Sequence, residues 1–288
     1  MKKWGFLFCL LSCAYLTFST TILEPKVEIQ KVDDYVKEED KSTSKKIHKK
    51  EITEKQIHQG NLLLVNQEYP VEQESIKSDI INLFSHSELT QGYGLMDSNI
   101  YLSKDIAIEF SNMIAAAKKE GVRHFSITSG FRDFEEQSVL YQEIGSDYAL
   151  PAGFSEHNLG LSLDVGSTQM KMAVALEGKW IEKNAWKYGF VLRYPKDKKD
   201  ITGIEYEPWH IRYVGLPHSA IMKEKDFVLE EYLDYLKDEK HISVKMNEEN
   251  YSITYYPISG SRTIPILNNS QFEISGNNMD GVIVTVYE

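Results

Sequence analysis

The stretch FSEHNLGLSLDVG, from Phe154 to Gly166, organises the rest of this 288-residue chain. It places an imidazole, His157, seven residues before a carboxylate, Asp164, and Gly160 marks a turn between them. Both side chains are common metal ligands, and glycine lets a chain turn where other residues are strained. We interpret the remainder of the chain as scaffold, anchor and substrate pocket for this stretch.

A second stretch, YEPWHIRYVG from Tyr206 to Gly215, places Glu207 three residues before His210. The residues from His210 onward alternate as in a strand. Pro208 excludes a regular helix between the two side chains, because proline lacks a backbone N–H and clashes with the preceding turn. A local bend is therefore needed to bring Glu207 and His210 to one face.

Together the two stretches offer two imidazoles and two carboxylates. A catalytic zinc site uses three protein ligands, an open position for water and a nearby glutamate that handles the proton. The residue types and the flanking glycines fit such a site. Each spacing taken alone is weak, and on these residues alone a purely structural role stays open.

The composition excludes some partners and some kinds of metal site. The net charge of −11 argues against nucleic acid as a partner, because an acidic surface repels phosphate. The only cysteines, Cys9 and Cys13, lie near the N-terminus, so the rest of the chain has neither a disulfide framework nor a cysteine-rich zinc site. Hydrophobic residues make up 42% of the chain, which is enough for a sizeable core.

The N-terminus contains an uncharged apolar run of 20 residues, from Trp4 to Leu23, preceded by two lysines. A helix of that length rises roughly 30 Å, enough to cross the hydrocarbon core of a bilayer. The lysines predict that the N-terminus stays inside the cell and the catalytic domain lies outside the cytoplasm. We therefore expect residues 1–23 to be a single-pass anchor in the cell membrane. A cleaved signal peptide and a lipoprotein signal ending at Cys13 are the alternatives.

Three segments follow the apolar run. Residues 24–60 are rich in charged residues and poor in large apolar ones, which predicts a flexible tether. Residues 61–240 contain both metal-site stretches and the helix and strand patterns of a folded domain. Residues 241–288 consist of short alternating runs split by Asn, Gly and Pro, which predicts a small β-rich C-terminal extension.

An arginine lies at a junction between two predicted elements. Phe125 and Ile127 alternate with polar residues as in a half-buried strand, and a helix is expected to begin at Asp133 or a neighbour. Arg132 therefore lies where the strand meets the helix, a common place for side chains that face a ligand. Taken alone, an arginine there is more often a surface residue.

The segment SEHNLGLSLD closely resembles the S-x-H-x-x-G-x-A-x-D signature of zinc D,D-peptidases of the VanY/VanX group, and EPWH matches their second signature. The upstream segment SGFRDFEEQ also looks like the arginine-containing segment of that family. The one departure is Ser162, where the pattern usually has alanine, and its hydroxyl needs a hydrogen-bond partner. The resemblance runs from about Asn61 to Asp238 and is closest to VanY-type enzymes, which also carry a membrane anchor.

The resemblance implies one zinc ion per chain, held by His157, Asp164 and His210. It assigns Glu207 as the general base for the zinc-bound water. This agrees with the chemistry, because zinc lowers the pKa of its bound water toward about 7 and polarises a carbonyl group.

The same resemblance implies that Arg132 stabilises the negative charge that develops on the peptide carbonyl oxygen. Ser155 and Gln137 would help to hold the terminal D-Ala. The implied activity is that of a zinc D,D-carboxypeptidase, which removes the C-terminal D-Ala from peptidoglycan precursors and so destroys the vancomycin target. The implied fold is α+β, with a small, mainly antiparallel sheet flanked by helices and the metal in a cleft.

The alternatives fall into three groups, namely another cell-wall peptidase activity, a binding module and a serine-type enzyme. The same site could serve an L,D-carboxypeptidase that trims tetrapeptides or a D,D-endopeptidase that cuts cross-links. A zinc-containing module that binds the cell wall without turnover would need neither Glu207 nor Arg132. A serine-type enzyme is excluded, because the S-x-x-K from Ser42 to Lys45 lies in the predicted tether without a K-T-G or S-D-N motif.

Overall fold

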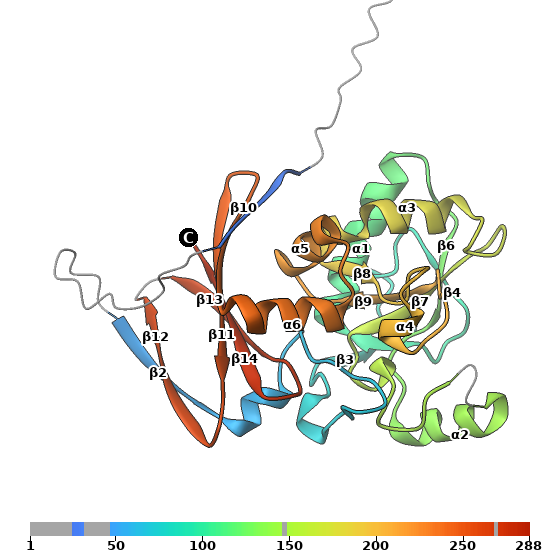
Figure 1. Ribbon diagram of the computed structural model, residues 1–288. Coiled ribbons are helices and arrows are strands. Elements are labelled where there is room, and N and C mark those ends of the chain that lie inside the picture. The colour runs from blue at the N-terminus through green and yellow to red at the C-terminus, as the bar shows by residue number, and fades with distance from the viewer. Residues whose placement is uncertain (1–24, 32–46, 146–148, 268–269) are drawn as a thin grey trace, which may run out of the picture.

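The computed structural model describes residues 25–31, 47–145, 149–267 and 270–288. Within them, two five-stranded sheets form the two halves of the molecule, and α6 (Leu229–Glu239) lies between these halves (Figure 1). The predicted α+β class is confirmed, because antiparallel sheets and helices are combined in one fold. The first sheet carries the predicted metal-site residues.

The first sheet has the order β4-β6-β7-β9-β8 and is antiparallel except for the β4–β6 pair. Its strands are β4 (Gly94–Leu95), β6 (Phe125–Ser129), β7 (Ser162–Ser167), β9 (His210–Tyr213) and β8 (Phe190–Leu192). This is the small, mainly antiparallel sheet that was expected. The central strand, β7, lies between β6 and β9, so its side chains can meet residues from both neighbours.

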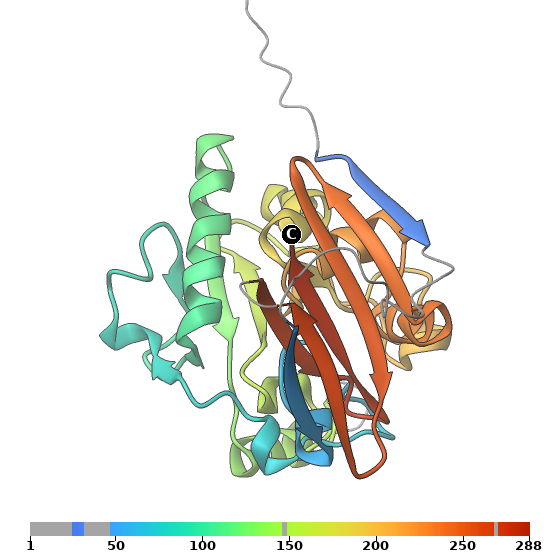
Figure 2. The same cartoon turned by 90° about the vertical axis from the view of Figure 1, so that its left-hand side faces the viewer.

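Helix α1 (Lys104–Lys119) has an apolar face that packs into the core of this half. The spacing of its apolar residues predicts the helix, and the structure buries all of them, namely Ile106, Phe110, Met113, Ile114 and Ala117. The half that contains the first sheet and the predicted metal-site residues is called the catalytic half below. Figure 2 shows α1 in green along one side of it. Burying one stripe of a helix in this way supplies most of its stability.

Shorter elements connect and flank the two sheets. A two-stranded sheet pairs β3 (Ile80–Asn82) with β5 (Tyr101–Ser103). The remaining α-helices are α2 (Phe134–Ile144), α3 (Leu176–Asn184), α4 (Lys199–Thr202) and α5 (His218–Lys225). The 3₁₀ turns are η1 (Glu54–His58), η2 (Gln73–Ser75), η3 (Leu83–Ser85), η4 (Glu156–Asn158) and η5 (Ala185–Tyr188).

The second sheet has the order β1-β10-β11-β14-β13, with every pair antiparallel. Its strands are β1 (Val27–Lys31), β10 (His241–Met246), β11 (Glu249–Pro257), β14 (Gly281–Tyr287) and β13 (Gln271–Gly276). A separate two-stranded sheet pairs β2 (Ile47–Thr53) with β12 (Ser261–Leu267). This sheet and the second five-stranded sheet together are called the β-rich half. The β-rich character expected for residues 241–288 is confirmed.

The prediction of a flexible tether over residues 24–60 is wrong for the parts of that segment that the structure describes. Strand β1 pairs with β10, and strand β2 pairs with β12. Ile52 and Ile57 are 0% and 6% exposed and belong to an apolar cluster of the β-rich half. The mean composition of this segment is polar, and it hides the few apolar residues that the segment contains. Burial of these residues against distant strands is enough to order the segment.

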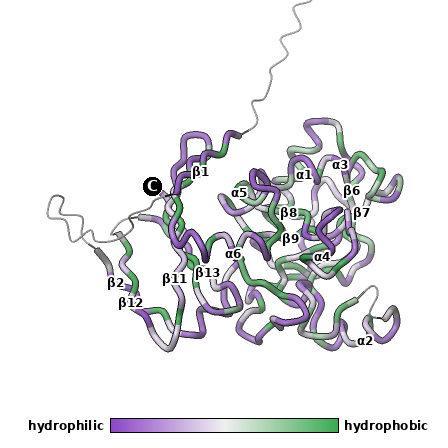
Figure 3. The backbone as a smooth tube through the Cα atoms, in the orientation of Figure 1, coloured by the Kyte–Doolittle hydropathy of each residue, from purple (hydrophilic) through white to green (hydrophobic). Residues whose placement is uncertain are grey.

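The buried apolar residues that the structure describes form three clusters, one in the catalytic half, one around α5 and α6, and one in the β-rich half. Figure 3 shows hydrophobic stretches in green in both halves of the molecule. The cluster around α5 and α6 contains residues of β10, β11 and the catalytic half. The two halves are therefore joined by an apolar core.

The predicted anchor, residues 1–23, lies outside the described residues. In the ranges that the structure does describe, no helix is both long enough and apolar enough to span a bilayer.

Candidate metal centre and active site

Three side chains that are far apart in the sequence converge on one point of the first sheet. His157 comes from η4, Asp164 from β7 and His210 from the first position of β9. Each offers one ligand atom, and these atoms all lie within 4.8 Å of one another. The sequence-predicted ligand set is thus brought together by the fold.

The local chain path explains the seven-residue spacing between the first two ligands. The turn η4 carries His157, and Gly160 then has a φ of +81°, which favours glycine. A Cβ at this position would also lie 2.5 Å from Cδ1 of Ile80. After Gly160 the chain enters β7, where Asp164 is directly opposite His210 of β9.

The hydrogen bonds of the two imidazoles decide which nitrogen faces the centre. Nδ1 of His157 lies 2.6 Å from the carbonyl oxygen of Gly130, which can only accept, so Nδ1 carries the proton. Nε2 of His157 is then free to bind a metal, and it lies 3.4 Å from Oδ2 of Asp164. In His210 it is Nδ1 that faces the centre, 3.0 Å from Oδ1 of Asp164.

The donor set fits zinc. Two imidazole nitrogens and one carboxylate oxygen are the kind of three-ligand set that catalytic zinc sites use, with a fourth position left for water. Burial alone would raise the pKa of Asp164, but His157 and His210 hold it below its ordinary value, so the carboxylate is ionised. The ligand carboxylate is therefore in the form that binds a metal.

Glu207 is close to the three ligands but is not one of the converging groups. It is half-buried, and its charge interacts with those of His210, Asp164 and Arg132. Burial raises the pKa of Glu207 to about 7. A carboxyl group with that pKa can accept and release a proton near neutral pH. The bend predicted from Pro208 is present, because the backbone N–H of His210 donates to the carbonyl oxygen of Glu207 at 3.2 Å and closes a turn between them.

Arg132 lies between the end of β6 and the start of α2, as predicted. Its Nε donates to Oε1 of Gln137 at 2.8 Å, and its Nη1 donates to Oγ of Ser129. Its Nη2 has no hydrogen-bond partner among the described residues, and the guanidinium interacts electrostatically with Asp164 and Glu207. The guanidinium is thus held by Gln137 and Ser129, and it lies near enough to the metal centre to interact with the charges of Asp164 and Glu207.

Ser155 and Gln137 are both buried beside the site, and their predicted role in holding substrate stays a prediction. The Ser155 hydroxyl accepts a hydrogen bond from the backbone N–H of His157 at 3.3 Å. Gln137 uses both ends of its amide inside the protein, since its nitrogen also donates to the carbonyl oxygen of Leu150 at 2.6 Å. Gln137 therefore links Arg132 to the backbone at Leu150.

Sequence reasoning missed a group of buried charges next to the ligands. Glu156, Arg193 and Arg212 have side chains that are 0–1% exposed, and both arginines contact Glu156. Burial would raise the pKa of Glu156, but the two arginines hold it well below its ordinary value. The hydroxyl of Ser162, the one departure from the family signature, donates to Glu156 at 3.1 Å. Charged residues in otherwise apolar strand patterns were the only available signal.

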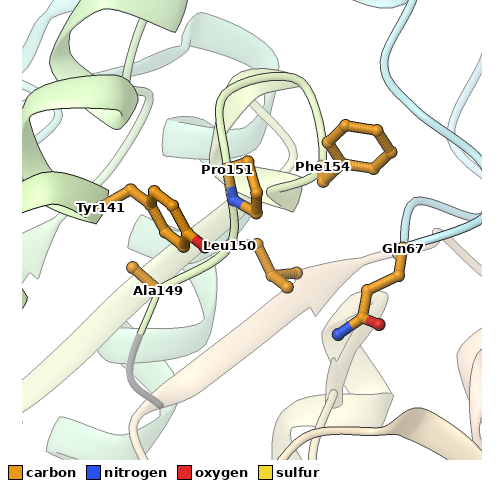
Figure 4. Close-up of a pocket in the computed structure, with 6 residues that line it drawn as sticks. All are labelled: Gln67, Tyr141, Ala149, Leu150, Pro151 and Phe154. Atoms are coloured by element: carbon orange, nitrogen blue, oxygen red, sulfur yellow. The ribbon is translucent and has the colours of Figure 1, made fainter. Parts of the chain in front are cut away.

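A mostly apolar cavity of about 310 Å³ adjoins this region. It is lined by Gln67, Tyr141, Ala149, Leu150, Pro151 and Phe154. Figure 4 shows the Leu150 side chain between those of Tyr141 and Gln67. Leu150 also accepts the hydrogen bond from Gln137, so the cavity is connected to Arg132 through two hydrogen bonds.

Comparison with known proteins gives consistent matches. The sequence model of the VanY family, described as D-alanyl-D-alanine carboxypeptidase, matches residues 99–216. A D-alanyl-D-alanine carboxypeptidase of Enterococcus faecium is 63% identical over 293 residues, which cover 100% of this chain and 97% of the relative. The residues that carry the metal centre all lie inside the matched range.

Two solved structures are also similar. The vancomycin resistance D,D-dipeptidase VanXYg, in complex with a D-Ala-D-Ala phosphinate analogue, superposes with a TM-score of 0.75 at 30% identity, covering 84% of this chain and 100% of that one. The L,D-carboxypeptidase LdcB superposes with a TM-score of 0.51 at 33% identity, covering 59% of this chain and 84% of that one. On the evidence of the 63% identity across the whole chain and of the matched family model, the chain belongs to the VanY family of D-alanyl-D-alanine carboxypeptidases.

Proposed function

We propose that this protein is a zinc-dependent D,D-carboxypeptidase that removes the C-terminal D-Ala from peptidoglycan precursor pentapeptides. The observation that carries the proposal is the convergence of His157, Asp164 and His210, with Glu207 and Arg132 interacting electrostatically with that centre. A purely binding module has no use for a proton acceptor with a pKa of about 7. Loss of the terminal D-Ala from cell-wall precursors would contribute to glycopeptide resistance.

The roles of the protein side chains follow from their positions. When bound by the two histidines and Asp164, zinc supplies Lewis acidity and lowers the pKa of a bound water. Glu207 accepts the proton of the attacking water and later delivers it to the amine of the departing D-Ala. Arg132 pairs with the negative charge that develops on the carbonyl oxygen, and Gln137 keeps its guanidinium in place. Ser155 and the adjoining cavity are candidates for contacts with the rest of the peptide.

An assay of defined peptides tests this proposal. Incubation with a pentapeptide ending in D-Ala-D-Ala should give a tetrapeptide and free D-Ala, identified by mass. A chelator should abolish the activity, zinc should restore it, and penicillin should leave the rate unchanged, because the mechanism uses no serine nucleophile. Full activity after exhaustive removal of metal would contradict the proposal.

The second candidate is an L,D-carboxypeptidase, which the similarity to LdcB favours. This enzyme would instead shorten the tetrapeptide and leave the pentapeptide intact. A D,D-endopeptidase would release two peptides from a cross-linked muropeptide. Offering all three substrates in parallel therefore identifies the reaction by its products.

The protein is also proposed to be anchored in the cell membrane through residues 1–23, which places its substrate outside the cytoplasm. The uncharged run from Trp4 to Leu23 and the lysines before it support this proposal. We expect the full chain to sediment with membranes, and Leu11→Arg to release a large part of it, because a charge at the centre of the run opposes insertion. Full-length protein that is wholly soluble with an intact N-terminus would refute the anchor.

A chain that begins at residue 25 is the matched soluble form for that experiment. It keeps β1 and β2, which pair with β10 and β12 in the β-rich half. A chain that begins near residue 60 would lose both strands, so its instability would say nothing about the anchor. The shortened chain should appear in the soluble fraction with the pentapeptide activity of the full chain.

A further inference from the structure

One buried carboxylate next to the metal centre has no role in the proposed reaction. Glu156 immediately precedes His157, and its side chain is 0% exposed. Its Oε1 accepts two hydrogen bonds of 2.8 Å, one from Nε of Arg193 and one from Nη1 of Arg212. Burying charged groups gives little net stability, so a charge cluster at this depth calls for another explanation.

The other oxygen of Glu156 faces a predicted ligand. Oε2 lies 3.3 Å from Nε2 of His210 and accepts from the hydroxyl of Ser162 at 3.1 Å. An ionised carboxylate can only accept, so Nε2 of His210 carries the proton. In a neutral imidazole, Nδ1 then has the lone pair, and Nδ1 is the atom that lies 3.0 Å from Asp164. The contact with Glu156 therefore selects the tautomer that can bind a metal through Nδ1.

The plane of the same imidazole is fixed by its neighbours. The ring of Tyr194 lies 5.0 Å from that of His210 with an angle of 34° between the planes. The ring of His157 lies 4.9 Å away at 76°. The ring is thus packed from two directions, and its two nitrogens contact Asp164 and Glu156.

We propose that Glu156 is the positioning residue for His210, and that Arg193 and Arg212 hold Glu156 in place. The inference rests on the proposed function in one respect, which is that His210 binds the metal. Ligating histidines commonly donate their second N–H to a carboxylate, and loss of that partner weakens metal binding by about 10–100-fold. Here that partner is held by two arginines.

Each arginine is fixed by residues outside the range matched by the family model. Arg193 makes a bidentate pair with Glu230 of α6, at 2.9 and 2.7 Å. Nη2 of Arg212 donates to the carbonyl oxygens of Asn61 and Leu63, at 3.0 and 2.9 Å. The two arginines thus have separate supports, one in α6 and one in the segment around Asn61 to Leu63. Glu156 therefore keeps its contact with Arg212 when the pair between Arg193 and Glu230 is weakened.

Two substitutions of Glu156 test separately the charge and the length of its side chain. Glu156→Gln cannot satisfy both sides, because its NH₂ group must face either the arginines or the proton on His210. Glu156→Asp keeps the charge but is one methylene shorter, so it cannot span the arginines and His210 together. Both variants should bind zinc about 10–100-fold more weakly in competition with a chelating dye. Their cobalt-loaded forms should show altered d–d absorption, since the orientation of a ligand has changed.

Glu230→Gln is the matched control. It changes a carboxylate that pairs with the same Arg193 but does not touch His210. We expect it to lower the melting temperature while zinc affinity stays within about twofold of the unchanged protein. Ser162→Ala should also leave the zinc affinity within about twofold. It removes the hydroxyl that donates to Oε2 of Glu156, but it leaves the contact between Glu156 and His210 in place.

The outcomes distinguish this inference from the proposed function. An unchanged protein that binds no zinc would defeat the proposed function. Normal zinc affinity and cobalt spectra in both Glu156 variants would overturn the positioning role, and so would an equal loss of affinity in Glu230→Gln.

A measurement on the unchanged protein covers the case in which both Glu156 variants fail to fold. Nitrogen-15 labelling of the zinc-loaded full chain should reveal a slowly exchanging, downfield imidazole proton on Nε2 of His210. Its absence would show that Nε2 does not donate to Glu156, which would overturn the inference.

Discussion

Glu207→Gln is expected to retain one zinc ion per chain and lose roughly 10²–10⁴-fold in kcat, the usual contribution of a positioned general base. Glutamine keeps the shape and the hydrogen bonding of the side chain but cannot accept the proton of water. Because Glu207 lies outside the converging ligand set, its loss should leave the metal in place. Metal analysis and turnover of the pentapeptide measure the two quantities on the same sample.

Asp164→Ala should lose the metal itself, whereas Glu207→Gln should lose only turnover. It removes one of three protein ligands, so the chain should lose its zinc and part of its stability. Glu205→Gln is the matched control, because this carboxylate is exposed, lies two residues before Glu207 and pairs with Lys199 at the surface. If Glu207→Gln is metal-free and Asp164→Ala is not, the two roles have been reversed.

Arg132→Lys is expected to reduce kcat by about 100-fold or more while zinc content is unchanged. Lysine keeps the positive charge but lacks the planar fork that lets Nε bond Gln137 while another nitrogen stays available. A single ammonium group cannot satisfy Gln137, Ser129 and a developing oxyanion in this geometry.

Arg123→Lys is the control for that substitution, since Arg123 is exposed and lies just before β6. It should have the turnover of the unchanged protein. Near-normal turnover of Arg132→Lys would mean that the guanidinium does not act on the reacting carbonyl.

Some elements follow from local sequence because local forces form them. The apolar spacing of α1 predicts its buried face, and Asp133 caps α2 through the backbone N–H of Glu136 at 2.8 Å. The position of Arg132 between a strand and a helix follows from these two neighbours. The ligand residues were also predicted, because the two signatures that carry the resemblance to zinc D,D-peptidases lie in short segments.

Other features depend on partners that lie far away in the chain. The pairing of β1 with β10 joins residues more than 200 positions apart, and the local composition of residues 24–60 contains no sign of it. The proposed positioning of His210 by Glu156 also depends on distant residues, because Glu156 contacts Arg212, which is 56 residues away in the sequence.

The sequence by itself predicted which residues bind a metal, move a proton and stabilise an oxyanion. Tertiary structure alone decided that these residues meet, which nitrogen of each histidine faces the centre, and which buried charges surround Glu156. The physical reason is that side-chain chemistry and short-range periodicity are local properties. Burial, register between strands and the pairing of charges arise only when distant segments exclude water together.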